Sequence, residues 1–394
     1  MYNPGLYVHV PFCRTKCPYC DFYSIVDLTL VPVWLDALER EARIYRERFG
    51  SFDSLYLGGG TPTILGSKEL TRLMGILFRE LSFSEDPEIT IEANPDDITK
   101  EKAALVRDLG FNRISLGVQS LHEKELRFLK RRHSAQQAEE AIERIVASGL
   151  TNLGIDLMYG LPGQGESEWM ASLKRIVGYN PAHISCYQMT ISEGTPFHRM
   201  LEQGRIQAPG EERERAFFLL TSAYLAENGY IHYEISNFAR EKRTMSRHNL
   251  KYWRHVPYLG LGPSAHSFLK GLRWWNLRSV NAYCQALACR KKPVEGHERL
   301  TDEQVRLESL FLGFRTNEGV KRALIEGCPG SGRALREIRS AGLVKLQADR
   351  IIPTREGFAL ADSLPLLFSH EPVPTPLNGT NRFPCEGGRF SITK

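Results

Sequence analysis

Three cysteines stand close together near the start of the sequence, at Cys13, Cys17 and Cys20, with the spacing CxxxCxxC. They follow the alternating apolar stretch 6–10, which is typical of a strand, so the three thiols should share one short loop. Three thiolates can hold three corners of a cubic iron–sulfur cluster, whose all-cysteine form takes four. The fourth iron would stay open for a substrate or cofactor, which is our preferred interpretation.

Zinc binding and inert thiols are the two alternatives that the cysteine motif leaves open. A structural zinc ion takes four ligands, and His9 is the nearest candidate for the fourth. On an alternating strand His9 should point to the same side as Tyr7, which places it poorly for joining the loop. The other five cysteines are scattered, and we expect them to be incidental thiols.

The composition is that of a soluble globular protein with two or three domains: 394 residues, 42% apolar and 25% charged. The net charge is only +5 and no block of lysines or arginines stands out, so nucleic acid is not an expected partner. No stretch approaches the roughly 18 apolar residues that a membrane span needs. Since the first residues run straight into a strand without a signal sequence, we expect a cytoplasmic protein.

Short apolar stretches alternate with amphipathic patterns as far as about residue 235. The expected strands are 6–10, 53–57, 88–93, 113–118, 153–158, 183–189 and 231–235. The expected helices are 33–48, 67–81, 99–109, 122–147, 167–177 and 211–228. This alternation predicts an α/β fold with a parallel sheet, either a closed barrel or an open, curved part of one. Ligands of such sheets bind at the carboxyl ends of the strands.

Four segments are expected along the chain. Residues 1–235 form the α/β core, and residues 236–298 form an irregular connecting region with short strands and a helix near 279–291. Helices followed by a hairpin in 299–368 predict a winged-helix-like α+β domain. Because this domain shows no strong basic stripe, we expect it to pack against the rest of the protein or bind a partner rather than bind DNA. The proline- and glycine-rich tail 369–394 is expected to be disordered.

A glycine-rich turn, Gly58-Gly59-Gly60-Thr61-Pro62, follows the second expected strand. With the cysteine loop, it resembles the radical S-adenosylmethionine superfamily. The segments YVHVPFC, EANP, GVQS and DLMYGLPG resemble, more narrowly, the family that joins oxygen-independent coproporphyrinogen III oxidases and haem chaperones. This resemblance runs from residue 5 to about 365 and implies a partial parallel (β/α) barrel.

The resemblance also implies the roles of individual residues. Cys13, Cys17 and Cys20 would hold a 4Fe–4S cluster. The residues implied to line or contact S-adenosylmethionine are Tyr7, Tyr19, Gly59, Gly60, Thr61, Glu92, Gln119, Arg131 and Asp156. A shift of one residue in the alignment would put Arg132 in the place of Arg131.

Two features separate the branches of this family. The oxidases carry a further cysteine two positions after the third, where this chain has Phe22. The HNxxYW signature of the chaperones is matched by the stretch His248-Asn249-Leu250-Lys251-Tyr252-Trp253. The resemblance therefore implies that His248 is an axial haem ligand and that Tyr252 and Trp253 pack against the porphyrin. If His248 is not the ligand, His255 and His266 are the next candidates. Without the resemblance, the stretch 248–253 can also be interpreted as a loop whose two aromatic side chains only pack in a small core.

The expected function is therefore that of a haem chaperone, which binds haem, a cluster and S-adenosylmethionine. It would pass haem to a haem-requiring acceptor protein, for which a membrane-bound respiratory enzyme is one candidate. Whether the chain is also an enzyme stays open. The alternatives are an oxygen-independent coproporphyrinogen III oxidase and a related methyltransferase or haem-degrading enzyme.

Overall fold

The computed structural model describes residues 3–369, so the predicted disordered tail, apart from Ser369, lies outside the described residues. Contacts divide the described chain into two compact units. The larger unit holds residues up to 232 together with 236–251 and 256–300. The smaller unit holds 233–235, 252–255 and the chain from 301 onward. None of the helices in residues 3–369 is long and apolar enough to cross a membrane.

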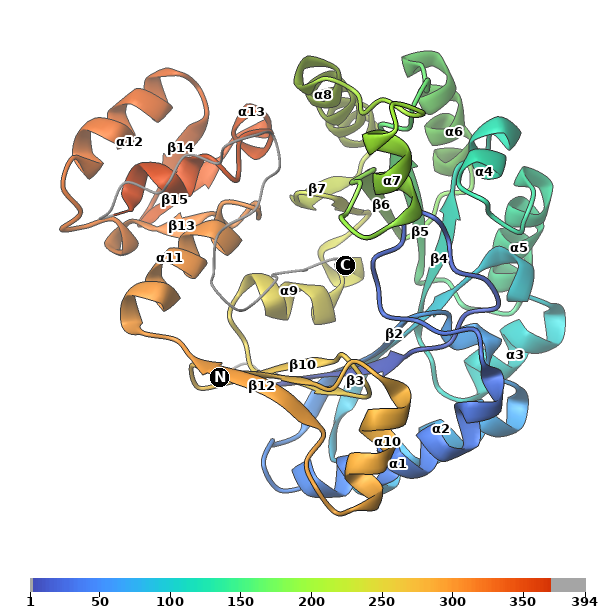
Figure 1. Cartoon of the computed structure of the whole chain (residues 1–394). Helices are drawn as coiled ribbons and strands as arrows, with labels where there is room; N and C mark the ends of the chain where they lie inside the picture. The colour runs from blue at the N-terminus through green and yellow to red at the C-terminus, as the bar shows by residue number, and fades with distance from the viewer. Residues whose placement is uncertain (1–2, 370–394) are drawn as a thin grey trace. The chain divides into compact units, whose positions relative to one another are not determined.

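A mostly parallel, curved sheet forms the centre of the larger unit (Figure 1). Its first six strands pair in parallel and in chain order: β1 Gly5–Val10, β2 Phe52–Gly59, β3 Phe83–Ala93, β4 Arg113–Gln119, β5 Leu153–Tyr159 and β6 His183–Gln188. The predicted parallel α/β fold is thereby confirmed.

Helices link these strands and lie along the outer face of the sheet (Figure 1). They are α1 Val31–Tyr45, α2 Ser67–Glu80, α3 Lys100–Asp108, α4 Glu123–Phe128, α5 Ala135–Ala147 and α6 Glu166–Gly178, followed later by α8 Glu211–Glu227. The main hydrophobic core contains Leu6 and Val8 of β1 with Trp34 of α1. Since side chains alternate along a strand, Tyr7 and His9 face the opposite, inner side of the sheet.

The single helix predicted over 122–147 is wrong, because α4 ends at Phe128 and α5 begins only at Ala135. Lys130 adopts a left-handed backbone conformation (φ 51°), which cannot continue a helix. Ser134 then caps α5 by accepting a hydrogen bond from the N–H of Gln137. The break produces a loop that carries Arg131 and Arg132.

The chain after residue 230 extends the sheet at both ends. β7 Ile231–Glu234 and β8 Asn237–Ala239 lie beyond β6, while β9 Tyr258–Leu261 pairs in parallel with β1. β10 His266–Leu269, β11 Leu272–Asn276 and β12 Val294–Arg299 continue from β9 in antiparallel fashion. Helix α10 Val280–Ala288 lies near its expected position, whereas α7 Pro196–Glu202 and α9 Arg247–Trp253 were not expected.

The smaller unit combines helices with a β-hairpin, and the winged-helix assignment stays a prediction. It comprises α11 Asp302–Gly313, β13 Val320–Lys321, α12 Ser331–Ser340, β14 Val344–Gln347, β15 Arg350–Pro353 and α13 Arg355–Phe358. The strands form a three-stranded antiparallel sheet with the order β13-β15-β14. Its separate core is built around Leu310, Phe314, Ile338 and Ile351.

Candidate cofactor site

The register of the parallel strands brings the predicted site residues to one edge of the sheet. His9 lies opposite Gly58 across β1 and β2, and Gly117 lies opposite Asp156 across β4 and β5. Glu92, near the end of β3, is opposite Ser115. Since all these strands run in the same direction, their carboxyl ends together form the base of the site.

The glycine turn after β2 holds the cysteine loop in place. The N–H of Gly60 donates to the Val10 carbonyl and the N–H of Thr61 donates to the Phe12 carbonyl, each at 2.8 Å. A Cβ atom at Gly60 would lie 2.5 Å from the Phe12 oxygen, so only glycine permits this approach. Gly59 has φ 105° and its N–H donates to Glu92 at 3.2 Å. The N–H groups of Gly59, Gly60 and Thr61 are therefore all engaged within the protein.

His9 is engaged at both ring nitrogens. Nε2 lies 2.8 Å from the Tyr23 carbonyl oxygen and Nδ1 lies 3.0 Å from the Tyr7 hydroxyl. Burial lowers the pKa of His9 to about 4, so the ring is neutral at neutral pH. The position of His9 agrees with the prediction that it does not join the cysteine loop.

The three thiols lie in partly buried, polar surroundings. Cys13 Sγ is 3.7 Å from Thr61 Oγ1, and Cys17 Sγ is 3.6 Å from an Arg131 nitrogen. Burial raises the pKa of the Cys13 thiol and raises that of the Cys20 thiol to about 11.

Within residues 3–369, no group of three or more His, Cys, Asp or Glu side chains is arranged to hold a single metal ion. A cubic cluster makes a different demand, because each thiolate binds its own iron. Three thiols on one loop, next to a cationic guanidinium, fit the donor set of such a cluster.

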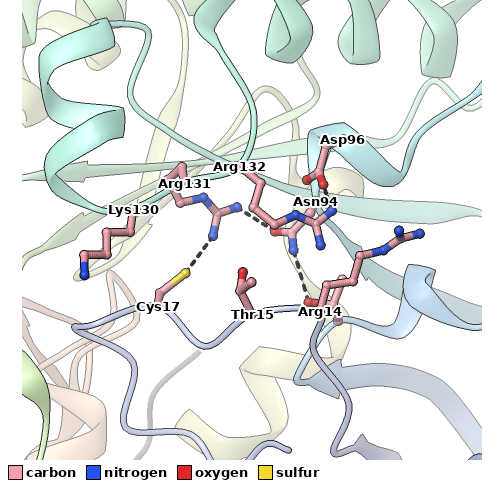
Figure 2. Close-up of a pocket in the computed structure, with 9 residues that line it drawn as sticks. Arg14, Thr15, Cys17, Asn94, Asp96, Lys130, Arg131 and Arg132 are labelled. Carbon is pink, nitrogen blue, oxygen red and sulfur yellow. Dashed lines mark hydrogen bonds and ion pairs between the residues drawn. The ribbon is translucent and has the colours of Figure 1, made fainter. Parts of the chain in front are cut away.

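Arg131 connects the cysteine loop to the strand ends (Figure 2). Its guanidinium donates to the Asn94 side-chain oxygen at 2.5 Å and to the Gly117 carbonyl at 2.8 Å, besides its contact with Cys17. It also lies 3.4 Å from the Tyr19 hydroxyl. Contacts with Tyr19 and Cys17 raise the pKa of Arg131 against the opposing effect of burial, so the guanidinium stays charged.

Arg132 is turned to a different set of partners. Its side chain pairs with Asp96 and lies 3.4 Å from Asp97. The pocket next to the cysteine loop is lined by both arginines and by Arg14, Thr15, Cys17, Thr61, Asn94, Asp96 and Lys130 (Figure 2). Of the two arginines that the sequence left open, Arg131 is the one that contacts Cys17.

Three further predicted residues lie on neighbouring strands, Glu92 and Gln119 towards the strand ends and Asp156 in the middle of β5. Glu92 accepts hydrogen bonds from the Tyr56 hydroxyl at 2.9 Å and from Gly59. Asp156 is buried and accepts from the Ser115 hydroxyl at 3.0 and 3.1 Å. Gln119 sits at an irregularity between β4 and β5 with φ 68°, an arrangement that redirects a side chain at the end of a strand.

Asn94 was quoted in a motif but not singled out as a site residue. Its amide nitrogen donates to Thr61 Oγ1 at 3.1 Å and its oxygen accepts from Arg131. Asn94 thus links the glycine turn to the arginine loop. Its place directly after the third strand was the signal that could have revealed this role.

His248 lies away from this edge, near the amino-terminal ends of β1 and β2. Its Nδ1 is 3.0 Å from the Ser54 hydroxyl, and its ring stacks on Tyr56 with centroids 5.2 Å apart. The residue is 1% exposed, and burial lowers its pKa to about 3. Tyr252 and Trp253, at the end of α9, belong to the smaller unit, where Arg315 lies 5.8 Å from the Trp253 ring centroid. Within the larger unit, His248 therefore lies away from the cysteine loop.

Comparison with known proteins supports the relationship that the motifs indicate. Residues 7–176 match the Radical SAM superfamily. The haem chaperone HemW of Mycobacterium tuberculosis H37Rv is 34% identical over 370 residues, covering 91% of this chain and 93% of the relative. HemW of Bacillus subtilis is 32% identical over 369 residues, covering 91% and 97%.

A solved structure also resembles this chain along most of its length. The structure of coproporphyrinogen III oxidase (HemN) from Escherichia coli, a radical SAM enzyme, matches with a TM-score of 0.79 and 25% identity. The match covers 93% of this chain and 90% of that chain. The chain therefore belongs to the HemN/HemW family of the radical S-adenosylmethionine superfamily.

Proposed function

We propose that this protein is a haem chaperone: it binds a 4Fe–4S cluster, S-adenosylmethionine and haem, and passes the haem to a haem-requiring acceptor protein. Family membership implies the cluster and S-adenosylmethionine, and relatives that cover 91% of the chain are named haem chaperones. The observation that carries the proposal is Phe22, because the oxidases of the family have a cysteine at this position.

Cys13, Cys17 and Cys20 would hold the cluster, leaving one iron for the amine and carboxylate of the methionyl group. When bound and reduced, such a cluster supplies the electron that cleaves S-adenosylmethionine. A carboxylate suits the charged guanidinium of Arg131, whose Nε is buried without a hydrogen-bond partner in the described part of the chain. An amine needs acceptors, which the carbonyl groups of the turn at Gly59, Gly60 and Thr61 can provide.

Glu92, Gln119 and Asp156 would bind the rest of S-adenosylmethionine. Their polar side chains lie on the adjacent strands β3, β4 and β5, and carboxylates suit ribose hydroxyls. Tyr7 and Tyr19 flank this position, Tyr7 on the inner face of β1 and Tyr19 beside Arg131. Together these residues orient the cofactor and exclude water from it.

The runner-up is an oxygen-independent coproporphyrinogen III oxidase, which the likeness to HemN favours. One anaerobic assay separates the two functions. The reconstituted protein is incubated with coproporphyrinogen III, a reductant and S-adenosylmethionine, and a second sample is titrated with haem and then mixed with a haem-free acceptor. We expect haem uptake and transfer without protoporphyrinogen formation. Protoporphyrinogen as product, with no haem uptake, would replace our proposal by the runner-up.

The predicted haem ligand His248, with Tyr252 and Trp253, stays a prediction. Because the His248 ring is buried against Ser54 and Tyr56, ligation of haem iron would require α9 to move away from the sheet. Replacing His248 by alanine tests this prediction: an unchanged haem spectrum and stoichiometry would show that another residue is the ligand.

A further inference from the structure

Glu92, which we propose to bind S-adenosylmethionine, is held in place by two hydrogen bonds from β2. The Tyr56 hydroxyl donates to one carboxylate oxygen at 2.9 Å, and the N–H of Gly59 donates to the other at 3.2 Å. Bonds to both oxygens fix the plane of a carboxylate as well as its position, and each oxygen keeps a further lone pair. The lone pairs that remain on Glu92 therefore keep one direction relative to the glycine turn.

Tyr56 is a buried tyrosine whose hydroxyl stays protonated. The residue is 4% exposed, and burial raises the pKa of its hydroxyl well above the ordinary value of 10. The nearby carboxylates of Glu92 and Asp156 raise this pKa further. At neutral pH the hydroxyl is therefore neutral, and it donates to Glu92 instead of repelling it.

The Tyr56 ring packs on the imidazole of His248. Their planes meet at 29° with centroids 5.2 Å apart, and Nδ1 of His248 lies 3.0 Å from the Ser54 hydroxyl. Because Ser54 lies two residues before Tyr56 on β2, the two side chains point to the same face of the sheet. One imidazole thus contacts both residues and restricts the orientation of the Tyr56 ring. Tyr7 completes the group, with its ring centroid 6.3 Å from that of Tyr56.

The first residues of α9, which belong to the larger unit, are anchored to the sheet. The N–H groups of Arg247 and His248 donate to the carboxylate of Glu88 on β3, each at 2.9 Å. Lys251 is buried and pairs with Asp53 of β2 at 2.5 Å. A buried ion pair and two charge-assisted hydrogen bonds are costly to break, so this part of α9 holds the imidazole in one place.

We propose that Tyr56 is a positioning residue for S-adenosylmethionine, which acts by orienting Glu92, and that His248 supports this role by fixing the Tyr56 ring. The inference rests on the proposed binding of S-adenosylmethionine at Glu92. It assigns to the first residue of the HNxxYW stretch a part in the cofactor site. A change at His248 should then reach the cofactor through Tyr56.

The test measures binding of labelled S-adenosylmethionine to the full-length, anaerobically reconstituted protein by equilibrium dialysis. Iron content and far-ultraviolet circular dichroism check that each variant folds and holds its cluster. Tyr56→Phe keeps the ring and removes the hydroxyl, and we expect it to bind about tenfold more weakly, because a hydrogen bond to a charged group is lost. Tyr230→Phe is the matched control, since its buried hydroxyl donates to the Pro181 carbonyl at 2.9 Å, and its affinity should be unchanged.

A double-mutant cycle tests the contribution of His248. His248→Ala should weaken binding by about threefold to tenfold in the wild type but by less than about twofold in Tyr56→Phe, because it acts through the hydroxyl that this variant lacks. Losses that multiply in the double variant would remove His248 from the inference. Wild-type affinity in Tyr56→Phe, or an equal loss in Tyr230→Phe, would overturn the inference while leaving the proposed function standing. Failure of the wild type to bind S-adenosylmethionine would instead reject the proposed function itself.

Discussion

A buried carboxyl group on α1 should make the stability of the larger unit depend on pH. Glu41 receives three hydrogen bonds, from the Gly262 N–H at 2.8 Å, the Asn276 amide at 2.6 Å and the Tyr283 hydroxyl at 2.5 Å. These partners lie on the part of the sheet and on the helix that support the strands carrying His266. Burial raises the pKa of Glu41 to about 7, above its ordinary value of 4.5.

The direction and size of the effect follow from proton linkage. Because the folded state holds the proton more tightly than the unfolded state, the stabilisation is complete below pH 4.5 and is lost as the pH rises through 7. The two pKa values give a contribution of about 2 kcal/mol at pH 5.5 and about 0.1 kcal/mol at pH 8. The free energy of unfolding should therefore lose about 2 kcal/mol from this group over that interval.

The measurement compares wild type with Glu41→Gln, which cannot ionise, in urea unfolding of the cluster-free protein at both pH values. The lowered pKa values of buried His9 and His248 act in the opposite direction but equally in both proteins. Tyr45 and Tyr283, the titratable neighbours of Glu41, have raised pKa values and stay neutral at both pH values. The wild type should lose about 2 kcal/mol relative to the variant between pH 5.5 and pH 8.

Parallel pH profiles of the two proteins would refute this reasoning. A relative gain by the wild type at pH 8 would go further: it would mean that the three donors stabilise the ionised carboxylate by more than burial destabilises it.

Three further substitutions test the cofactor site. Cys17→Ser should abolish the brown colour of the anaerobic protein and most of its iron, whereas an unchanged iron count would point to another site. Arg131→Met should weaken S-adenosylmethionine binding in equilibrium titration by roughly 10-fold to 100-fold, because a charged hydrogen bond contributes about 1.5–3 kcal/mol. Arg132→Met is the matched control. Equal losses in both variants would contradict the assignment of the methionyl carboxylate to Arg131. Gly60→Ala should destabilise the protein by about 1–3 kcal/mol and lower cluster loading, because the new Cβ atom would lie 2.5 Å from a backbone oxygen. The control Gly50→Ala, whose Cβ atom would have no neighbour within 4 Å, should change neither stability nor cluster loading.

The parallel core could be predicted because its sequence signal is local. Each strand from β1 to β5 contains a short apolar run, and each of these runs is followed by a helix that buries apolar residues. Right-handed crossovers then allow few arrangements, so the strand ends and the residues on them could be placed together. Cys13, Glu92 and Asp156 follow from that rule without any knowledge of side-chain contacts.

The break between α4 and α5 could not be predicted from the same signal. The helical pattern continues across it, and Lys130 is not a residue that usually adopts positive φ. The break is maintained by tertiary contacts, since the loop brings Arg131 to Cys17 and Asn94. Tertiary contacts of Arg131 thus override a local helical preference.

Short strands were expected in 236–298, but their place in the sheet could not be predicted because their partners are distant in the sequence. β9 pairs with β1, some 250 residues earlier, and β12 alternates half-buried and exposed residues along its length, as an edge strand does. Such strands lack the continuous apolar run that marked the core. The same distance hid the environment of His248, whose partners Ser54 and Tyr56 come from β2.

The adjacent pair Trp274 and Trp275 shows what the sequence can and cannot decide about which face of a strand packs against the core. Period-two alternation requires the two rings to lie on opposite sides of β11. Only the packing of Trp274 against Tyr45 identifies which ring is structural, and it leaves Trp275 beside His266 on the face opposite the core. Substitutions by alanine at Trp274 should therefore lower the free energy of unfolding more than alanine at Trp275, measured by urea unfolding, because only Trp274 lies in the main core; equal losses would contradict this division.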